Sequence, residues 1–328
     1  MSNKIHYSEI ESIAHIGLSK TGSTYLQNHI FPQLFDTYYS TDENFKWPKN
    51  LDYIREINRF WYEDLYLNEM ILKDSIREKN YEKKINQKYQ QYKKQVDLFR
   101  VGHSNLTTPL LLSSEGLCGL SLKTCDTSMK LLKQSGVTKI IFVIRRQTDF
   151  AQSLWKQFLL TEDRFKKYIP FEVLFGGETN EGIFELDWNI YINSILSNFN
   201  EKNVCVVPYE LFVESPHKFI KCLVDFLGVT IDKKINIKNV ITNPSKKNVI
   251  YKSLKLDHSN FMIKYPMVRK LLRSFLINNK NYLPDCFFEM KSITVKKDII
   301  DIIKQRYKAK NVLLESRFNL SLSQYKYF

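Results

Sequence analysis

Residues 19–24 of this chain read SKTGST, which places a lysine and a glycine among four hydroxyl side chains. The apolar run at 13–16 precedes them and predicts a short buried strand. The residues that follow, up to Leu34, have the spacing of a helix. A tight turn between a strand and a helix presents backbone N–H groups at the helix N-terminus, where the helix dipole favours an anion. The stretch therefore predicts an anion-binding loop.

The positions of the glycines and of the lysine restrict the kind of loop. Gly17 and Gly22 have the spacing of the nucleotide-binding P-loop, and Thr24 takes its hydroxyl position. Ser23, however, stands where that motif has its lysine, and the lysine of this chain is Lys20, inside the turn. We therefore expect a loop that binds a phosphate-type group with a lysine in a different place from that of a nucleoside triphosphatase.

A second pair of residues suits the same class of ligand. Arg145 follows the apolar run at 139–144, and Ser153 comes eight residues later on an expected helix. A guanidinium and a hydroxyl group together can bind a phosphate dianion through charge-assisted hydrogen bonds. The next residue, Arg146, could take the same role, but the spacing to Ser153 favours Arg145.

Two residues are candidates for a general base. Glu115 follows a predicted buried strand at 109–112, and a carboxylate at such a strand end can take the proton of a hydroxyl acceptor. His103, in a polar Gly-His-Ser turn, is the alternative. His15 lies within the first apolar strand and is interpreted as a core histidine with satisfied hydrogen bonds.

The elements that must position these residues alternate along the chain. Apolar runs that predict strands occur at 13–16, 109–112, 139–144 and 204–207, with helical patterns between them and a short strand expected at 38–40. This alternation predicts an α/β domain with a central parallel sheet. Ligands of such sheets bind beyond the carboxyl ends of the strands, where the candidate residues fall.

An aromatic, charged stretch at about 51–100 has helical spacing and predicts a helical hairpin inserted between strands. Such an insertion either covers an acceptor site or forms an outer layer. The chain lacks a flexible linker or a repeat, so we expect a single domain over 1–328.

The loop and the arginine–serine pair together resemble the donor-binding elements of sulfotransferases that use 3′-phosphoadenosine 5′-phosphosulfate (PAPS), whose loop core reads roughly K-[ST]-G-[ST]-T. The family has Asn-Pro after its arginine, whereas this chain has Arg146-Gln147, as bacterial members do. The segment that begins Tyr209-Glu210 and ends in FLG at 226–228 resembles the part of the family whose tyrosine approaches adenine. The NPS sequence at 243–245 resembles a late loop of bacterial relatives.

This resemblance implies a three-layer P-loop-like fold and PAPS as the donor cosubstrate. Lys20 and a base, Glu115 or His103, are the implied catalytic residues. The implied donor-binding residues are Ser19, Lys20, Thr21, Gly22, Ser23, Thr24, Arg145, Ser153, Tyr209, Asn243 and Ser245.

The net charge of +14 is unevenly distributed. Residues 233–328, expected to be mainly helical, hold 21 Lys+Arg against 6 Asp+Glu, whereas residues 1–232 hold 28 against 29. Such a surplus indicates an anionic partner, and we expect a hydroxyl acceptor in an acidic bacterial polysaccharide or glycolipid. Nucleic acid is not expected, because the chain carries no nucleic-acid-binding signature.

The five cysteines have no metal-site spacing, so we expect no metal and reduced thiols. No signal region and no 18-residue apolar run occur, unlike in the membrane-anchored Golgi sulfotransferases, so we expect a soluble cytoplasmic enzyme.

Two other functions remain open from the sequence. A P-loop-type kinase would need a lysine directly after Gly22 and an acidic metal ligand, a role that Glu115 would have to take. A non-enzymatic polyanion-binding protein would explain the basic C-terminal part but not the two phosphate-type motifs.

Overall fold

The computed structural model describes residues 12–18, 20–35, 38–40, 110–114, 118, 122–134, 136–160, 171–176, 184–228, 250–254, 288–292 and 294–328. The chain forms two compact units. The first comprises Met1–Phe150, Phe184–Val240 and Lys304–Phe328, and the second comprises Ala151–Ile183 and Ile241–Ile303. The single domain over 1–328 stays a prediction. The expected insertion at 51–100 lies outside the described residues.

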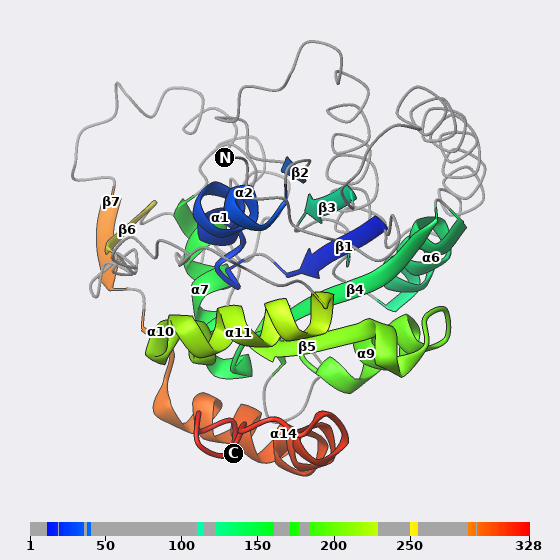
Figure 1. The fold of residues 1–328 in the computed structure, drawn as a ribbon. Helices are drawn as coiled ribbons and strands as arrows, with labels where there is room; N and C mark the ends of the chain where they lie inside the picture. The colour runs from blue at the N-terminus through cyan, green and yellow to red at the C-terminus, as the bar shows by residue number, and fades with distance from the viewer. Residues whose placement is uncertain are drawn as a thin grey trace, which may run out of the picture. The chain divides into compact units, whose positions relative to one another are not determined.

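A five-stranded parallel sheet forms the centre of the first unit (Figure 1). Its strand order is β2-β3-β1-β4-β5. The strands are β1 (Ser12–Gly17), β2 (Tyr38–Ser40), β3 (Leu110–Ser114), β4 (Val137–Ile144) and β5 (Val204–Pro208). Near-continuous apolar runs are typical of parallel strands that are covered on both faces. The predicted α/β class and parallel sheet are confirmed.

Helices cover one face of this sheet through a continuous apolar cluster. They are α1 (Ser23–Tyr25), the π-helical turn η1 (Leu26–Ile30), α2 (Phe31–Leu34), α10 (Tyr209–Glu214) and α11 (Pro216–Leu227). Ile13, Ile141 and Val143 project from the strands into the same cluster as Phe31 and Phe219 of the helices. Because alternate residues of a strand face the same way, this cluster takes every second side chain of β1 and β4.

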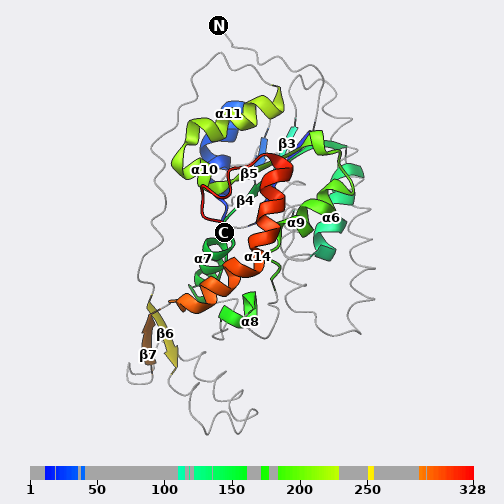
Figure 2. The ribbon, with the colours of Figure 1, turned by 90° about the horizontal axis from the view of Figure 1, so that it is seen from below.

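The other face is covered by α6 (Leu122–Gln134) and α9 (Trp188–Leu196), which lie side by side (Figure 2). The 3₁₀ turn η5 (Glu201–Asn203) lies between α9 and β5 in the chain. Phe142 of β4 points to this side and contacts Tyr191, with ring centroids 6.5 Å apart. Ser194 of α9 donates a hydrogen bond to Asp126 of α6. Two helical layers around the sheet make the predicted three-layer arrangement.

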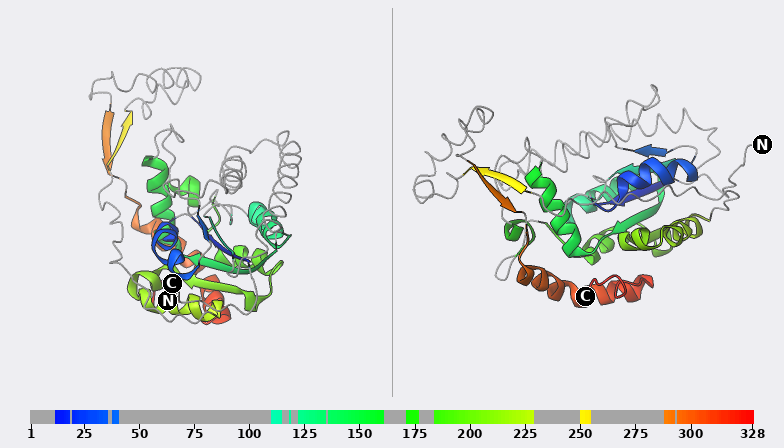
Figure 3. Two further views of the ribbon diagram at one scale, coloured as in Figure 1. Left: turned by 45° about the horizontal axis from the view of Figure 1, so that its top comes forward. Right: turned by 90° about the vertical axis from the view of Figure 1, so that its left-hand side faces the viewer.

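The second unit contains most of the helix that was expected around Ser153, together with elements that the sequence did not predict. Trp155 of α7 (Gln147–Leu160) packs edge-on against Phe171 of α8 (Phe171–Phe175), with centroids 5.6 Å apart. The strands β6 (Ile250–Leu254) and β7 (Phe288–Ser292) form an antiparallel pair (Figure 3). They lie within the part expected to be mainly helical, which also contains the long helix α14 (Lys297–Phe318).

Candidate active site

The loop between β1 and α1 has the backbone of an anion-binding turn. Lys20 has a φ of 74° and Gly22 a φ of 84°, both in the left-handed region. Alternation of left- and right-handed residues turns successive N–H groups to one side of the chain, which makes an anion-binding concavity. The carbonyl of Gly22 accepts hydrogen bonds from the N–H groups of Tyr25 and Leu26, at 3.0 and 3.1 Å, and so begins the helix. Thr21 stabilises the turn from within, because its Oγ1 donates to the carbonyl of Leu18 at 2.7 Å.

Tyr209, the first residue of α10, packs directly on this loop. A Cβ atom at Gly22 would lie 2.6 Å from Cε2 of the Tyr209 ring, so a glycine is required for the close approach as well as for its φ. Burial raises the pKa of Tyr209, and the nearby Arg145 partly opposes the increase.

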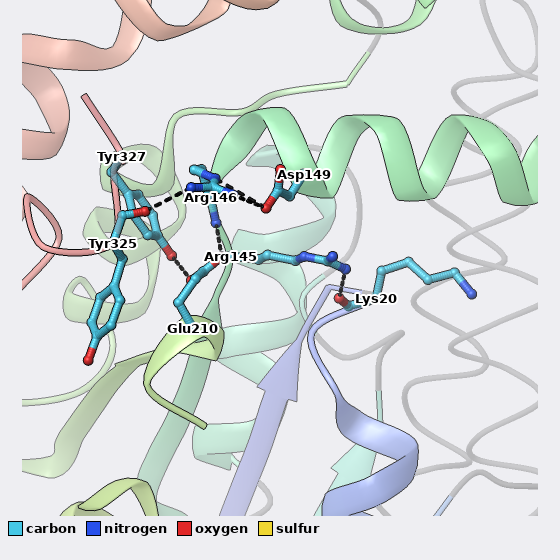
Figure 4. A network of polar contacts seen from close by, with 7 residues as sticks. All are labelled: Lys20, Arg145, Arg146, Asp149, Glu210, Tyr325 and Tyr327. Atoms are coloured by element: carbon cyan, nitrogen blue, oxygen red, sulfur yellow. Dashed lines mark hydrogen bonds and ion pairs between the residues drawn. The ribbon is translucent and has the colours of Figure 1, made fainter. Parts of the chain in front are cut away.

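Arg145 connects the end of β4 to the loop (Figure 4). Its Nη1 donates to the carbonyl of Lys20 at 2.6 Å, and its guanidinium carbon lies 5.0 Å from the centre of the Tyr209 ring. Its own carbonyl accepts a hydrogen bond from Nε1 of Trp188 at 3.0 Å. Its Nε is buried without a hydrogen-bond partner among the described residues. The structure thus brings the loop, the end of β4 and the start of α10 together around this guanidinium.

The neighbouring Arg146 is instead committed to the protein. Its Nε and Nη2 donate to one oxygen of Asp149, at 3.1 and 2.5 Å, and its Nη1 donates to the carbonyl of Tyr325 at 3.1 Å. Its backbone N–H donates to Oε1 of Glu210 at 3.0 Å. In Figure 4 the two arginines point in different directions, and the Lys20 ammonium points away from both.

Glu210 is a half-buried residue that sequence reasoning did not select as part of the site. Its Oε2 accepts a hydrogen bond from the hydroxyl of Tyr327 at 2.8 Å. Burial raises the pKa of Glu210, while the hydrogen bonds from the Arg146 backbone and from Tyr327 oppose the increase. Because 117 residues separate Glu210 from Tyr327, no local sequence pattern could reveal this contact.

A second buried polar cluster lies beneath the loop. Nδ1 of His15 is 2.8 Å from Oγ of Ser113 on the neighbouring strand, and Nε2 of Gln27 donates to the same hydroxyl at 2.9 Å. Complete burial lowers the pKa of His15 to about 3, so the imidazole is neutral at physiological pH. The predicted core position of His15 is confirmed, but only Nδ1 has a described partner, whereas the buried Nε2 has none among the described residues.

The structure places only some of the predicted site residues. Lys20, Thr21, Gly22, Arg145 and Tyr209 are brought together as described above. Ser23 is buried and Thr24 exposed at the start of α1, and Ser153 is half-buried on the part of α7 that belongs to the second unit. The candidates that lie outside the described residues are Ser19, His103, Glu115, Asn243 and Ser245.

Two kinds of feature are absent from the part of the chain that the structure describes. No helix among them is both long and apolar enough to cross a membrane. No group of three or more His, Cys, Asp and Glu side chains in this part of the chain could hold a metal ion.

Several solved sulfotransferase structures resemble this chain. A sulfotransferase from Alicyclobacillus acidocaldarius is 12% identical, covers 97% of this chain and 99% of its own, and has a TM-score of 0.48. A mouse sulfotransferase complexed with PAP is 14% identical, with 70% of this chain and 62% of its own covered and a TM-score of 0.38. The sulfotransferase domain of a Synechococcus olefin synthase is 18% identical, with 69% and 77% covered and a TM-score of 0.35.

A comparison with curated proteins gives no match. The family model of the sulfotransferase domain, in contrast, matches residues 12–310, which span the loop, all five strands of the parallel sheet and most of α14. The chain therefore belongs to the sulfotransferase domain family, whose enzymes transfer sulfuryl groups.

Proposed function

We propose that this sulfotransferase moves the sulfuryl group of PAPS to a hydroxyl group of a carbohydrate acceptor. The observation that supports the donor most is the position of Arg145, which contacts the loop at Lys20 and stacks over Tyr209. Its buried Nε lacks a described partner, and a phosphate oxygen is the kind of acceptor that a guanidinium binds best. Arg146 cannot compete for this role without breaking its bonds to Asp149 and Tyr325.

In this proposal the parts of the donor are bound by different elements. The backbone N–H groups of the loop and the Lys20 ammonium bind the 5′-phosphosulfate, and Tyr209 contacts the adenine. Arg145 binds the 3′-phosphate together with Ser153 of α7. PAPS supplies a sulfuryl group on a good leaving group, 3′-phosphoadenosine 5′-phosphate (PAP).

The reaction is a direct displacement at sulfur. The acceptor oxygen forms a new S–O bond as the bond from sulfur to the 5′-phosphate oxygen breaks. The acceptor proton passes to Glu115, the proposed general base, with His103 as the alternative. Lys20 stabilises the negative charge that develops on the departing phosphate oxygen, which is an electrostatic contribution made in the transition state.

The charge distribution supports an anionic acceptor. Residues 233–328 carry all of the excess positive charge, and a basic surface raises the local concentration of an acidic glycan. We therefore propose a sugar hydroxyl in a polysaccharide or glycolipid as the acceptor.

The donor assignment is tested with Arg145→Ala and the affinity for PAP measured by titration calorimetry. Loss of a charged hydrogen-bond donor to the 3′-phosphate is expected to weaken binding by about 1–3 kcal/mol. Lys218→Ala removes one exposed positive charge from α11 and serves as the control, with an expected change of less than about 0.5 kcal/mol. An Arg145→Ala variant that binds PAP as well as the wild type would contradict the assignment.

The base is tested with Glu115→Gln, which keeps the size of the side chain and removes its basicity. Turnover is expected to fall by about 10²–10⁴ while PAP affinity stays unchanged, since general base catalysis contributes on that scale. His103→Ala is measured in parallel under the same conditions. Normal turnover in Glu115→Gln together with an inactive His103→Ala would transfer the role to His103.

A further inference from the structure

The residues after α14, at positions 319–328, fold back into a compact segment of the first unit. Leu322, Tyr325 and Tyr327 are buried, with exposed fractions of 0%, 6% and 1%. The side chain of Glu315 on α14 accepts hydrogen bonds from both N and Oγ of Ser323, at 2.9 and 2.8 Å. The N–H groups of Tyr325 and Tyr327 both donate to the carbonyl of Leu322. The 319–328 segment therefore has a defined conformation of its own.

This segment contacts the residues next to Arg145 at two points. The carbonyl of Tyr325 accepts from Nη1 of Arg146, and the hydroxyl of Tyr327 donates to Oε2 of Glu210 (Figure 4). A third bond holds the segment in place, because Nδ2 of the buried Asn311 donates to the carbonyl of Tyr327 at 3.1 Å.

Behind these contacts, two adjacent residues of the β4–α7 junction face two adjacent residues of α10. Arg145 lies over the ring of Tyr209, and the N–H of Arg146 donates to Glu210. The hydrogen bond between Arg146 and Glu210 therefore fixes the position in which Arg145 lies over Tyr209. The carboxylate of Glu210 is half-buried, so both of its oxygens need hydrogen-bond donors. The Arg146 N–H donates to one oxygen, and the hydroxyl of Tyr327 donates to the other.

We propose that the 319–328 segment is a positioning element of the donor site, and that Tyr327 acts through Glu210 to hold Arg145 in its binding position over Tyr209. Tyr327 and Glu210 are positioning residues that do not touch the donor. The inference rests on the proposed role of Arg145 at the 3′-phosphate. It predicts that a hydroxyl far from the donor changes recognition of one particular phosphate group.

The test compares Tyr327→Phe with Tyr325→Phe. The first removes the hydrogen bond to Glu210 and keeps the ring. The second is the matched control, because Tyr325 contacts Arg146 only through its backbone carbonyl and its hydroxyl points away from the network in Figure 4. Affinities are measured by calorimetry for PAP and for adenosine 5′-monophosphate, which lacks the 3′-phosphate.

Tyr327→Phe is expected to weaken PAP binding about three- to tenfold. One hydrogen bond to a charged group contributes more than this, and only part of its loss is expected to reach Arg145. Binding of adenosine 5′-monophosphate should change less than about twofold, as should both affinities in Tyr325→Phe. In an Arg145→Ala background, the further addition of Tyr327→Phe should cost less than about twofold, because the group that it positions is gone.

Other results would overturn the proposal in distinguishable ways. An equal loss for both ligands, or a loss that persists without Arg145, would show that Tyr327 only supports folding. Unchanged PAP binding in a folded Tyr327→Phe would exclude any positioning role. If Tyr327→Phe does not fold, Glu210→Gln is used instead, since it turns the charge-assisted bond into a weaker neutral one and should give a smaller loss of the same selectivity. A wild-type protein that does not bind PAP would overturn the donor assignment itself.

Discussion

At the scale of single residues, the two adjacent arginines at the end of β4 have different partners. Arg145 contacts the loop and Tyr209. Arg146 instead forms hydrogen bonds with Asp149, Tyr325 and Glu210. A guanidinium has five N–H donors in a fixed planar arrangement, so its partners decide what else it can bind. Here that difference separates the arginine that we propose binds the donor from one whose hydrogen bonds are made within the protein.

His15 gives a prediction about the pH dependence of folding. Its pKa is about 3 in the folded protein and about 6.5 in the unfolded chain. Between these values the unfolded chain binds a proton that the native protein does not, so stability falls as the pH decreases from about 6.5 towards 3. This single group contributes a slope of up to about 1.4 kcal/mol per pH unit.

The measurement is urea unfolding of the wild type and of His15→Gln at several pH values in this range. All other titrating groups are common to the two proteins, so the difference between their slopes isolates His15. The variant is expected to lose less stability per pH unit. Parallel curves for the two proteins would show that the native imidazole titrates normally.

At the scale of elements, the loop depends on backbone conformations that most residues avoid. The left-handed φ of Gly22 costs about 1–2 kcal/mol in any residue with a Cβ, and the ring of Tyr209 leaves no space for that atom. The start of α10 and the loop therefore fit together only with glycine at this position.

Gly22→Ala is expected to reduce the free energy of unfolding by about 2–4 kcal/mol, the sum of backbone strain and overpacking, and to weaken PAP binding. Gly228→Ala is the matched control, because Gly228 also has a left-handed φ, of 67°, at the end of α11 but has open space around it. The control should lose only the backbone part, about 1–2 kcal/mol, and keep its PAP affinity. Equal losses in the two variants, measured by urea unfolding, would argue against the contact with Tyr209.

At the scale of the whole molecule, positive charge exceeds negative charge by 14, and residues 233–328 account for that excess.

A sulfuryl group carries less negative charge than a phosphoryl group, so its transfer needs less positive charge at the reaction centre. We infer that Lys20 provides enough positive charge for the departing phosphate, in place of the metal ions that phosphoryl transfer requires.

We therefore predict that turnover persists in the presence of EDTA. The assay follows PAP release from PAPS with and without the chelator, and a Mg²⁺-dependent kinase measured alongside confirms that the chelator is effective. Complete loss of activity that added Mg²⁺ restores would show instead that the transfer needs a metal ion.

The frame of the site could be predicted from the sequence because its signals are local. Apolar runs of strand length, such as the one that became β4, report burial on both faces, and the glycine spacing around Lys20 reports a turn before a helix. The core position of His15 followed from its apolar neighbours in the same way. The long-range contacts of these residues do not produce a local pattern in the sequence.

Only the folded chain decided that Arg145 contacts the Lys20 carbonyl, that Glu210 is held by Tyr327, and that Gly22 touches Tyr209. These contacts join residues more than 100 positions apart, so no periodicity or spacing in the sequence records them. The sequence by itself determined the sulfotransferase loop and the strands that carry it, because hydrophobic pattern and backbone freedom act over a few residues. The partners of each charged group depended on the tertiary structure, because burial and hydrogen bonding are properties of the packed chain as a whole.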